Sequence, residues 1–364
     1  MDVLDLRQLN RATLARQSLL ERSAEPVADL VRRAGGLQAQ LPSAPTIGLW
    51  SRLAGFTSDH LQAAVREGKL VRGTTLRGTL HLHEVDDYRA LRMSVQSFLD
   101  TAANGMRRRM EPDDFEAALE LGRAQFAAGP ITVAELKRTL AESLPRSEAQ
   151  ALANVSRLLL QLLIVPDPDS PHGWRVNAPF VDARSIVGDT LAPPDPEHVV
   201  RRFLEVLGPG SAKDAGVWSS VRGLRKVMQE MHDRGELITV ATWDGGELYD
   251  LPDAPRPDGD VVVPPRFLPM WDNLLLSHAD RSRVLDPAHK AYLASKNGMP
   301  PPAFLVDGFV AGRWKAERDG ARAELVLTPF GRIPAAAEDP LVAEGEALLR
   351  FLEPDAGSYR VRVG

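Results

Sequence analysis

Residues 70–83 read LVRGTTLRGTLHLH, in which polar and apolar residues alternate around two glycines. Alternation with a period of two, rich in Thr and interrupted by Gly, is typical of two short strands joined by a turn. Three segments upstream have apolar residues at helical spacing, namely 14–31, 47–53 and 59–70. Three helices followed by a β-hairpin is the pattern of the winged-helix variant of the helix-turn-helix plan.

The ends of these helices carry residues that stop or cap helices. Gly35-Gly36 ends the first helical segment, because glycine readily adopts the left-handed conformation found just after helices. Ser43 and Thr57 can cap the second and third helices through their hydroxyl groups. The first part of the chain is therefore predicted to form one winged-helix unit.

The same order of elements recurs twice. The second unit is predicted from helices over 133–144, opened by Thr132, and over 148–165, opened by Ser147, followed by a pair of short strands within 166–180. The third is predicted from three helical segments, 197–208, 211–220 and 221–235, and a hairpin over 236–251 with its turn at Asp244-Gly245-Gly246. No strict residue period accompanies this repeat, so it is a repeat of pattern.

The predicted fold class is α+β, with three tandem winged helix-turn-helix units and a β-rich C-terminal part. Pro-rich, charged linkers at 191–197 and 252–260 mark unit boundaries, since neither helix nor strand forms there. The C-terminal part contains a hairpin with its tip at Arg318-Asp319-Gly320 and an amphipathic helix over 340–354. The predicted domains are residues 1–110, 111–190, 191–255 and 256–364.

Composition excludes several classes of protein. The chain has 364 residues, 44% of them hydrophobic and 26% charged, as in ordinary globular proteins. The absence of cysteine excludes disulfides, thiol nucleophiles and thiolate metal sites. No run approaches the roughly 18 apolar residues that a spanning helix needs, and the first twenty residues lack the apolar core of a signal peptide. A cytoplasmic protein without a membrane partner is expected.

Charge is distributed unevenly along the chain. The formal net charge is −5, but residues 1–110 contain 16 basic and 11 acidic side chains and so carry +5. Such segregation is expected when one face of a protein meets a polyanion, although chance clustering would give the same count.

Enzymatic signatures are scarce. No GxSxG, HExxH, P-loop or GxGxxG motif occurs. The chain therefore lacks the motifs that usually accompany acyl transfer, zincin chemistry and nucleotide hydrolysis. His81 and His83 would share one strand face, which is a possible start of a metal site, but no third ligand is obvious. We therefore expect neither a metal ion nor another cofactor.

Basic and polar side chains of the first unit indicate a DNA-binding surface. They combine cations with small hydroxyl donors to phosphate, and the two histidines could position a sugar or phosphate. The residues predicted to bind DNA here are Arg66, Lys69, Arg72, Thr74, Thr75, Arg77, His81 and His83. A hairpin from another part of the chain could probe the minor groove, and the segments 306–328, with Arg313 and Lys315, and 238–250 are both open candidates.

Two strings are more specific than these patterns. Residues 35–53 read GGLQAQLPSAPTIGLWSRL, and residues 76–88 read LRGTLHLHEVDDY. Together they resemble the winged-helix DNA glycosylases that unhook interstrand crosslinks, the AlkZ-like and YcaQ-like superfamily. The resemblance extends across the chain to the C-terminal strings PMWDNLLLSHADRSRVL and VDGFVAGRWK. It implies a DNA-repair function.

The resemblance also implies the catalytic residues. The family motif, glutamine, an apolar residue, then glutamine or aspartate, corresponds to Gln38, Ala39 and Gln40. A final glutamine resembles the AlkZ-like branch, which is associated with self-resistance to DNA-alkylating natural products. Without this resemblance, both amides would be read as polar surface residues after a helix end.

Two amides limit the chemistry that is expected. Glutamine does not ionise near neutral pH, so it cannot act as a true general base. The substrate must then be activated already, as in cationic N7-alkylguanine, whose base leaves neutral. These considerations predict a monomeric, monofunctional glycosylase acting on alkylated purines, including crosslinked forms, in double-stranded DNA of the nucleoid. The alternative is a non-catalytic winged-helix DNA-binding regulator, and the roles of Asp272 and His278 stay open.

Overall fold

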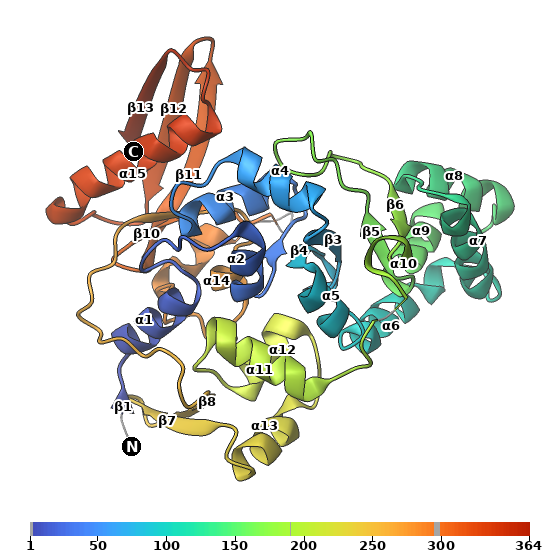
Figure 1. Cartoon of the computed structure of the whole chain (residues 1–364), viewed down its shortest axis with the longest axis horizontal. Helices are drawn as coiled ribbons and strands as arrows, with labels where there is room; N and C mark the ends of the chain where they lie inside the picture. The colour runs from blue at the N-terminus through green and yellow to red at the C-terminus, as the bar shows by residue number, and fades with distance from the viewer. Residues whose placement is uncertain (1–2, 190, 295–298) are drawn as a thin grey trace.

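The computed structural model describes residues 3–189, 191–294 and 299–364, and it confirms the α+β class. Figure 1 shows helices surrounding short strands in the centre, a strand-rich C-terminal part that rises from the body, and a helical unit of α7, α8 and α9 that projects sideways. The strands described form one three-stranded sheet and two five-stranded sheets. No described helix has both the length and the apolar character needed to cross a membrane.

The N-terminal part forms more, shorter elements than the sequence predicted. The segment 14–31 is not one helix, because Ser18 is left-handed (φ 52°) and Pro26 precedes the second helix. The elements are β1 (Val3–Leu4), α1 (Leu6–Arg16), α2 (Val27–Arg33), β2 (Leu37–Gln38), α3 (Ser43–Arg52), α4 (Ser58–Arg66), β3 (Leu70–Thr74), the 3-10 turn η1 (Leu76–Gly78), β4 (Leu80–Glu84), α5 (Val85–Leu91) and α6 (Gln96–Asn104).

Local signals predicted the middle of these elements better than their ends. The hairpin over 70–83 is confirmed as β3 and β4, and Thr57 is the N-cap of α4. Ser43 lies inside α3, whose N-cap is Pro42. Helix α4 ends four residues before the predicted Leu70, because the chain turns at Gly68 (φ 67°) into β3.

The second unit departs most from prediction. Its elements are the 3-10 turn η2 (Arg107–Arg109), α7 (Asp114–Ala128), α8 (Val133–Ser143), α9 (Ala149–Leu159), β5 (Leu162–Ile164), β6 (Phe180–Asp182) and α10 (Arg184–Val187). Thr132 caps α8 as predicted, whereas Glu148 and not Ser147 is the N-cap of α9. The helix predicted over 148–165 ends early because its last apolar residues form the buried strand β5. The Pro-rich segment predicted as strands is a loop between β5 and β6.

The third unit follows its prediction closely. It consists of α11 (Pro196–Leu207), α12 (Ala212–Ser219), α13 (Leu224–Asp233), β7 (Ile238–Thr242) and β8 (Glu247–Asp250). Ser211 caps α12, and the hairpin turns at the glycine predicted for it, Gly245 (φ 81°). Strand β1 adds to β7 in parallel, so the start of the chain completes this sheet.

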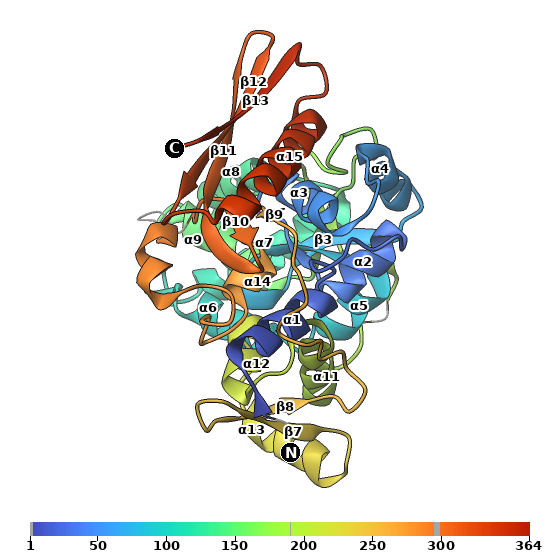
Figure 2. The same ribbon diagram turned by 90° about the vertical axis from the view of Figure 1, so that its left-hand side faces the viewer.

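The C-terminal part is a five-stranded sheet covered on one face by a helix. Its elements are β9 (Arg266–Leu268), α14 (Asn273–Leu276), the 3-10 helix η3 (Pro287–Leu293), β10 (Ala303–Val306), β11 (Phe309–Asp319), β12 (Arg322–Pro329), α15 (Ala335–Leu352) and β13 (Ser358–Val363). The strand order is β13-β12-β11-β10-β9, and the hairpin tip lies between Asp319 and Arg322 as predicted. Figure 2 shows α15, the predicted terminal helix, along one face of these strands.

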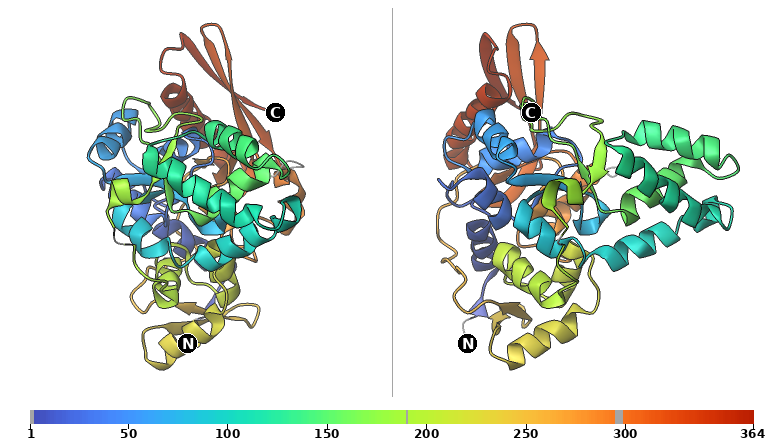
Figure 3. Two further views of the ribbon diagram at one scale, coloured as in Figure 1. Left: turned by 90° about the vertical axis from the view of Figure 1, so that its right-hand side faces the viewer. Right: turned by 45° about the vertical axis from the view of Figure 1, so that its right-hand side comes forward.

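One sheet joins the first two units. Its order is β2-β4-β3-β5-β6, and Gly73 of β3 is paired with Leu163 of β5. A side chain at Gly73 would force Leu163 to shift, since its Cβ would lie 2.7 Å from Leu163 Cδ2 and 3.1 Å from Leu162 O. This sheet and the β1–β7 pairing both cross the predicted domain boundaries, which stay predictions. The right-hand view of Figure 3 shows how α7, α8 and α9 project from this sheet.

The order of elements is similar in the three units. In the first, β2 lies between α2 and α3 and pairs with the hairpin strand β4. In the second, Ile131 lies between α7 and α8 and bridges to Phe180, and in the third Gly210 lies between α11 and α12 and bridges to Tyr249. Each unit therefore consists of a helix, a short extended segment, two helices and a hairpin.

Buried ion pairs connect parts of the chain that are distant in sequence. Arg16 of α1 donates two hydrogen bonds to Asp250 at the end of β8, both of 2.9 Å, and both side chains are at most 1% exposed. Arg52 of α3 makes a similar pair with Asp272, with distances of 2.9 and 2.8 Å. These contacts tie the N-terminal helices to the third unit and to the C-terminal part.

Candidate functional site

The two predicted catalytic glutamines lie on a short extended segment that follows two glycines. Gly35 and Gly36 have φ values of 71° and 80°, which reverse the chain after α2. Gln38 is paired with His81 of β4, and the amide N–H of Ala39 donates to Leu80 O. The strand β2 ends at Gln38, Ala39 is fully buried, and Gln40 lies in the bend that follows.

Arg77 holds the amide of Gln38. Its Nη2 lies 3.0 Å from His81 Nε2, 3.0 Å from Asn273 Oδ1 and 3.3 Å from Gln38 Oε1, so its two N–H groups are shared among three acceptors, and its Nη1 donates to Trp218 O (3.0 Å). Arg77 itself is left-handed (φ 55°), an uncommon conformation for a residue with a side chain. Burial lowers the pKa of Arg77 to about 10, so it remains a cation at neutral pH.

His81 is fixed as a neutral imidazole. Burial, the charge of Arg77 and the neighbouring His83 hold the pKa of His81 well below its ordinary value. Since its Nε2 accepts from Arg77, its Nδ1–H donates to Thr79 O at 3.1 Å. Both ring nitrogens are occupied, so His81 has no proton to offer to a leaving base.

Gln40 differs from Gln38 in exposure. The Gln38 side chain is buried, whereas Gln40 is exposed at the end of the segment. Arg72, which is buried, donates from Nε to Ala39 O (2.9 Å) and from Nη2 to Gln40 O (3.4 Å). Arg72 therefore supports the backbone of the motif and leaves the Gln40 amide at the surface.

A chain of buried polar side chains lies beneath Gly36. Thr75 Oγ1 is 2.8 Å from His83 Nε2, and His83 Nδ1 is 3.5 Å from Asp87 Oδ2. Burial would raise the pKa of Asp87, but the interaction with the nearby His83 and the charge of Arg202, 2.9 Å away, bring it below its ordinary value. A Cβ on Gly36 would lie 2.6 Å from His83 Cε1, so the imidazole packs directly under the glycine.

The C-terminal part contributes a residue that the sequence did not single out. Asn273, the first residue of α14, donates to Gly36 O (2.6 Å) and accepts from Arg77. Asp272 is the N-cap of α14 and is held by Arg52, so its role is to orient this turn. The only local signal was the Asp-Asn pair before an apolar run, which is typical of a helix start.

The side chains predicted to bind DNA fall into two groups. Arg66, Lys69, Arg313 and Lys315 are exposed. Arg72, Thr74, Thr75, His81 and His83 are buried, and Arg77 is partly buried. Buried side chains that bond to protein groups have no surface to present to a duplex in this structure. His278 is buried elsewhere; burial and Arg283 lower its pKa to about 3, and its Nε2–H donates to Leu207 O.

Helix α4, which carries Arg66 and is the last helix before the β3–β4 hairpin, is partly covered. The loop 165–179 packs against it, and a Cβ on Gly173 would lie 2.8 Å from Val65 Cγ2. Arg66 Nη2 donates to Pro168 O of the same loop at 3.5 Å. This loop occupies part of the helix surface that would otherwise enter a DNA groove.

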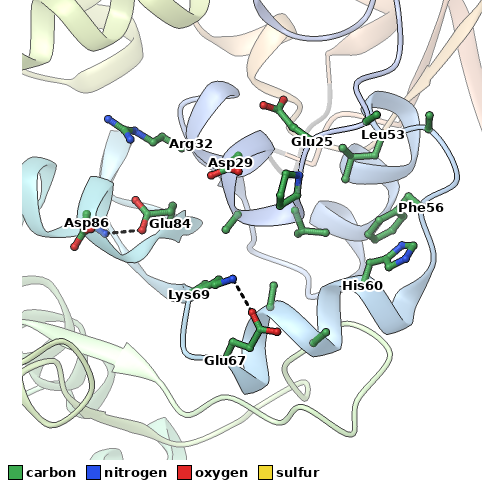
Figure 4. Close-up of a pocket in the computed structure, with 17 residues that line it drawn as sticks. Glu25, Asp29, Arg32, Leu53, Phe56, His60, Glu67, Lys69, Glu84 and Asp86 are labelled. Carbon is green, nitrogen blue, oxygen red and sulfur yellow. Dashed lines mark hydrogen bonds and ion pairs between the residues drawn. The ribbon is translucent and has the colours of Figure 1, made fainter.

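A hollow of about 740 Å³ lies on another side of the first unit, between α2 and α4. Figure 4 shows its charged lining, where Lys69 is paired with Glu67 at 2.7 Å. Its lining includes neither Gln38 nor Gln40, and five of its side chains are carboxylates. The hollow is therefore separate from the glutamine motif, and its charge is unfavourable for phosphate near Lys69.

No group of three or more His, Asp or Glu side chains in the described part of the chain could hold a metal ion. The polar groups around Gln38 are instead an arginine, a neutral histidine and an asparagine. Such a set can orient an amide and place dipoles, but it includes no carboxylate and no acid that titrates near neutral pH.

Comparisons with known proteins agree with the resemblance seen in the sequence. The model of a family described as "DNA glycosylase AlkZ-like" matches residues 31–351. An interstrand DNA cross-link repair glycosylase of Streptomyces sahachiroi is 24% identical over 351 residues, covering 89% of this chain and 90% of that protein. The solved structure of the Streptomyces sahachiroi DNA glycosylase AlkZ has a TM-score of 0.77 at 22% identity, with full coverage of both chains.

Proposed function

Since this chain belongs to the AlkZ-like family of DNA glycosylases, we propose that it takes part in interstrand crosslink repair by hydrolysing the N-glycosidic bond of cationic N7-alkylguanine in DNA. The observation that carries the proposal is the environment of Gln38, an amide held by the cation Arg77, which is itself bonded to a neutral His81 and to Asn273. Family membership favours an enzyme over the non-catalytic winged-helix regulator.

The reaction needs no acid from the protein. The bond between C1′ and the base nitrogen breaks, and its electron pair neutralises the cationic base. Positive charge develops on the sugar, water adds to C1′, and the water proton passes to solvent. An enzyme without an acid beside its amides should therefore release alkylated cationic bases and leave uracil, a neutral base, in place.

The protein's contribution is orientation and electrostatics. Gln38 Oε1 accepts one hydrogen bond from Arg77 and has a second lone pair for a water molecule. Gln40 lies two residues further along the chain and is exposed, so its amide is free to contact the nucleotide or the attacking water. Removing one preorganised dipole of this kind typically costs about 3–4 kcal/mol of transition-state stabilisation.

We propose that the buried residues predicted to bind DNA support the motif. Arg72 holds its backbone, and His81 and His83 hold Arg77 and Gly36. Arg77 makes no ion pair with a carboxylate in the described residues, so its charge is available to a phosphate next to the damaged nucleotide. Arg66, Arg313 and Lys315 are exposed and remain proposed DNA contacts, as does Lys69 in its acidic surroundings.

The similar order of elements in the three units supports their interpretation as tandem winged helices. The absence of lysine from the 38–40 motif supports a monofunctional reaction that leaves an abasic site. We further propose that the protein acts as a monomer on DNA of the nucleoid, since its substrate is chromosomal. Borohydride trapping of a covalent adduct with DNA would contradict the monofunctional assignment.

The decisive experiment compares the wild type with the Gln38→Ala/Gln40→Ala variant. Release of N7-methylguanine from a duplex should fall by at least 10²-fold, since each lost dipole costs about 3–4 kcal/mol. Affinity for the same duplex, measured in parallel, should stay within a few-fold of wild type. Release at the wild-type rate would refute the assignment of Gln38 and Gln40, and efficient release of uracil by the wild type would reveal an acid outside this site.

A further inference from the structure

The C-terminal sheet has one open face. On β12, Leu325 and Leu327 are fully buried on the side of α15, and on β13 Val361 packs against the same core. Tyr359 also turns to this side, where its hydroxyl donates to Glu353 O at 2.9 Å. The alternate residues of β11, β12 and β13 therefore point away from α15.

The open face is rich in long charged side chains. Strand pairing aligns Lys315 with Val326 and Arg362, Glu317 with Glu324 and Arg360, and Asp319 with Arg322 and Ser358. Arg313 lies opposite Thr328 one row further along. The cations on this face are Arg313, Lys315, Arg322, Arg360 and Arg362, and the carboxylates are Glu317, Asp319 and Glu324.

Three of these arginines lie within 4 Å of the Glu324 carboxylate. Its carboxylate lies 2.9 Å from Arg322 Nη2, 3.7 Å from Arg360 Nε and 3.6 Å from Arg362 Nε. The Glu324 side chain is 17% exposed, whereas those of the three arginines are 46–61% exposed. One carboxylate can neutralise one guanidinium, so this group presents excess positive charge to solvent while the carboxylate is recessed.

From this arrangement we propose that the open face of β11, β12 and β13 binds the phosphate backbone of duplex DNA, with Arg360 and Arg362 of the last strand as the new contacts. The proposal rests on the proposed function, which makes DNA the substrate. Guanidinium groups suit phosphate because they donate in a planar fork. The contact extends the one proposed for Arg313 and Lys315 across two further strands.

The composition of the face favours DNA over a protein partner. Protein interfaces need a central set of apolar or aromatic side chains that become fully buried. The aligned rows of the open face contain one such residue, Val326, and it is already partly buried. The face also belongs to the part of the sheet that rises from the body of the protein (Figure 2).

The test compares two double variants that remove the same charge. Arg360→Ala/Arg362→Ala alters the open face, whereas Arg332→Ala/Arg350→Ala removes two exposed arginines of α15 and the preceding loop. Binding of an undamaged duplex is measured from about 50 to 200 mM KCl. The slope of log K against log salt should become shallower by about 2 for the first variant, about one per lost phosphate contact, and stay unchanged for the control.

A third variant predicts the opposite change. Glu324→Gln leaves the shape of the side chain but removes the recessed negative charge, so duplex affinity should rise and the salt slope should steepen. If Glu324 only held the sheet together, affinity would fall with the melting temperature. Thermal unfolding of each variant separates these outcomes, because loss of structure lowers the melting temperature whatever the salt.

Unchanged duplex affinity and salt slope in Arg360→Ala/Arg362→Ala would overturn the inference. Binding of the wild type to anionic phospholipid vesicles that depends on these arginines, with duplex binding unaffected, would also overturn it. The proposed function fails separately, through the absence of N7-methylguanine release by the wild type. A protein that binds duplex through this face without releasing the base would refute the proposed chemistry alone.

Discussion

At the scale of single residues, Arg77 connects more of the site than any other described side chain around Gln38. The two N–H groups of its Nη2 are shared among Gln38, His81 and Asn273, and its Nη1 donates to a backbone carbonyl. A lysine has three donors on a flexible stem and cannot reproduce this planar arrangement. The geometry of Gln38 therefore depends on an arginine at this position.

Arg77→Lys should lower the single-turnover rate of N7-methylguanine release by about 10–100-fold. Loss of a hydrogen bond to a charged group costs about 1.5–3 kcal/mol, which corresponds to that range. Arg89→Lys is the matched control, because Arg89 is bonded to Asp86 and Val187 O away from the motif. Equal rates for Arg77→Lys and wild type would show that Arg77 does not position Gln38.

Buried histidines should make stability depend on pH. The pKa values of His81 and His278 are lowered in the folded protein, the latter to about 3, whereas the unfolded chain titrates near about 6.5. The unfolded state thus binds protons first as the pH falls. The free energy of unfolding should decrease below about pH 6.5, by up to about 1.4 kcal/mol per pH unit for each histidine.

Urea unfolding at pH 7.5, 6.5 and 5.5 measures this dependence. The slope should be smaller in His278→Asn, whatever the variant's absolute stability, and unchanged in His60→Asn, which alters an exposed histidine. The buried carboxylates Asp87 and Asp214, whose pKa values are lowered, contribute only near and below about pH 4. Equal stability at all three pH values would contradict the neutral, buried state of these imidazoles.

Part of this site could be predicted from sequence. The assignment of Gln38 and Gln40 as catalytic residues rests on a family motif and stays a prediction, since two amides after a helix end have no physical signature of catalysis. Asn273 was missed because it reaches the motif from 237 residues away, through its bond to Gly36 O. The burial of His83 and Arg72 was also missed, because strand alternation places two residues on one face without saying which face is covered.

At the scale of elements, the turn between α2 and β2 decides where the motif lies. Gly36 has φ 80° and packs against the imidazole of His83. Gly68 also has a left-handed conformation, φ 67°, but a Cβ there would meet no atom within 4 Å. A substitution at Gly68 therefore measures the cost of the left-handed conformation alone, whereas a substitution at Gly36 adds the steric contact with His83.

Gly68→Ala should cost about 1–2 kcal/mol of stability, the penalty of the left-handed conformation, and leave base release unchanged. Gly36→Ala should cost more and also lower base release, because β2 must move away from His83. Urea unfolding and single-turnover release measure both variants. Equal losses for the two variants would show that the contact between Gly36 and His83 does not hold the motif.

The elements show which kinds of structure local patterns predict. Alternation identified β3 and β4, and turn residues identified the tips of the hairpins β7–β8 and β11–β12. Local patterns did not predict that β2 and β5 would flank this hairpin, because strand partners distant in sequence leave no local signal. The apolar run that forms β5 fitted a helix equally well, as short apolar runs do.

At the scale of the whole molecule, buried ion pairs account for part of the basic excess of residues 1–110. Arg11, Arg16 and Arg52 are at most 3% exposed and pair with Asp307, Asp250 and Asp272 in later parts of the chain. Arginines used inside the protein cannot attract a polyanion. A count of charges along the sequence therefore overestimated the basic surface of this part.

Asp250→Ala should destabilise the protein by about 3–5 kcal/mol, because it leaves Arg16 as a buried cation without its partner. Glu230→Ala is the control, since it breaks the exposed pair with Lys226 and should change stability by less than about 0.5 kcal/mol. Urea unfolding measures both. A loss below about 1 kcal/mol for Asp250→Ala would show that this contact does not tie α1 to the third unit.

The pairing of β3 with β5 has a mechanical consequence. The sheet continues from the first unit into the second through the pair Gly73–Leu163, where the glycine lets the two strands lie close together. A duplex that touches both units must then match the arrangement that this shared sheet gives them. The DNA must then deform to fit the protein, and this deformation costs free energy. A lesion that makes the double helix easier to deform would therefore be bound more tightly, before any base is contacted.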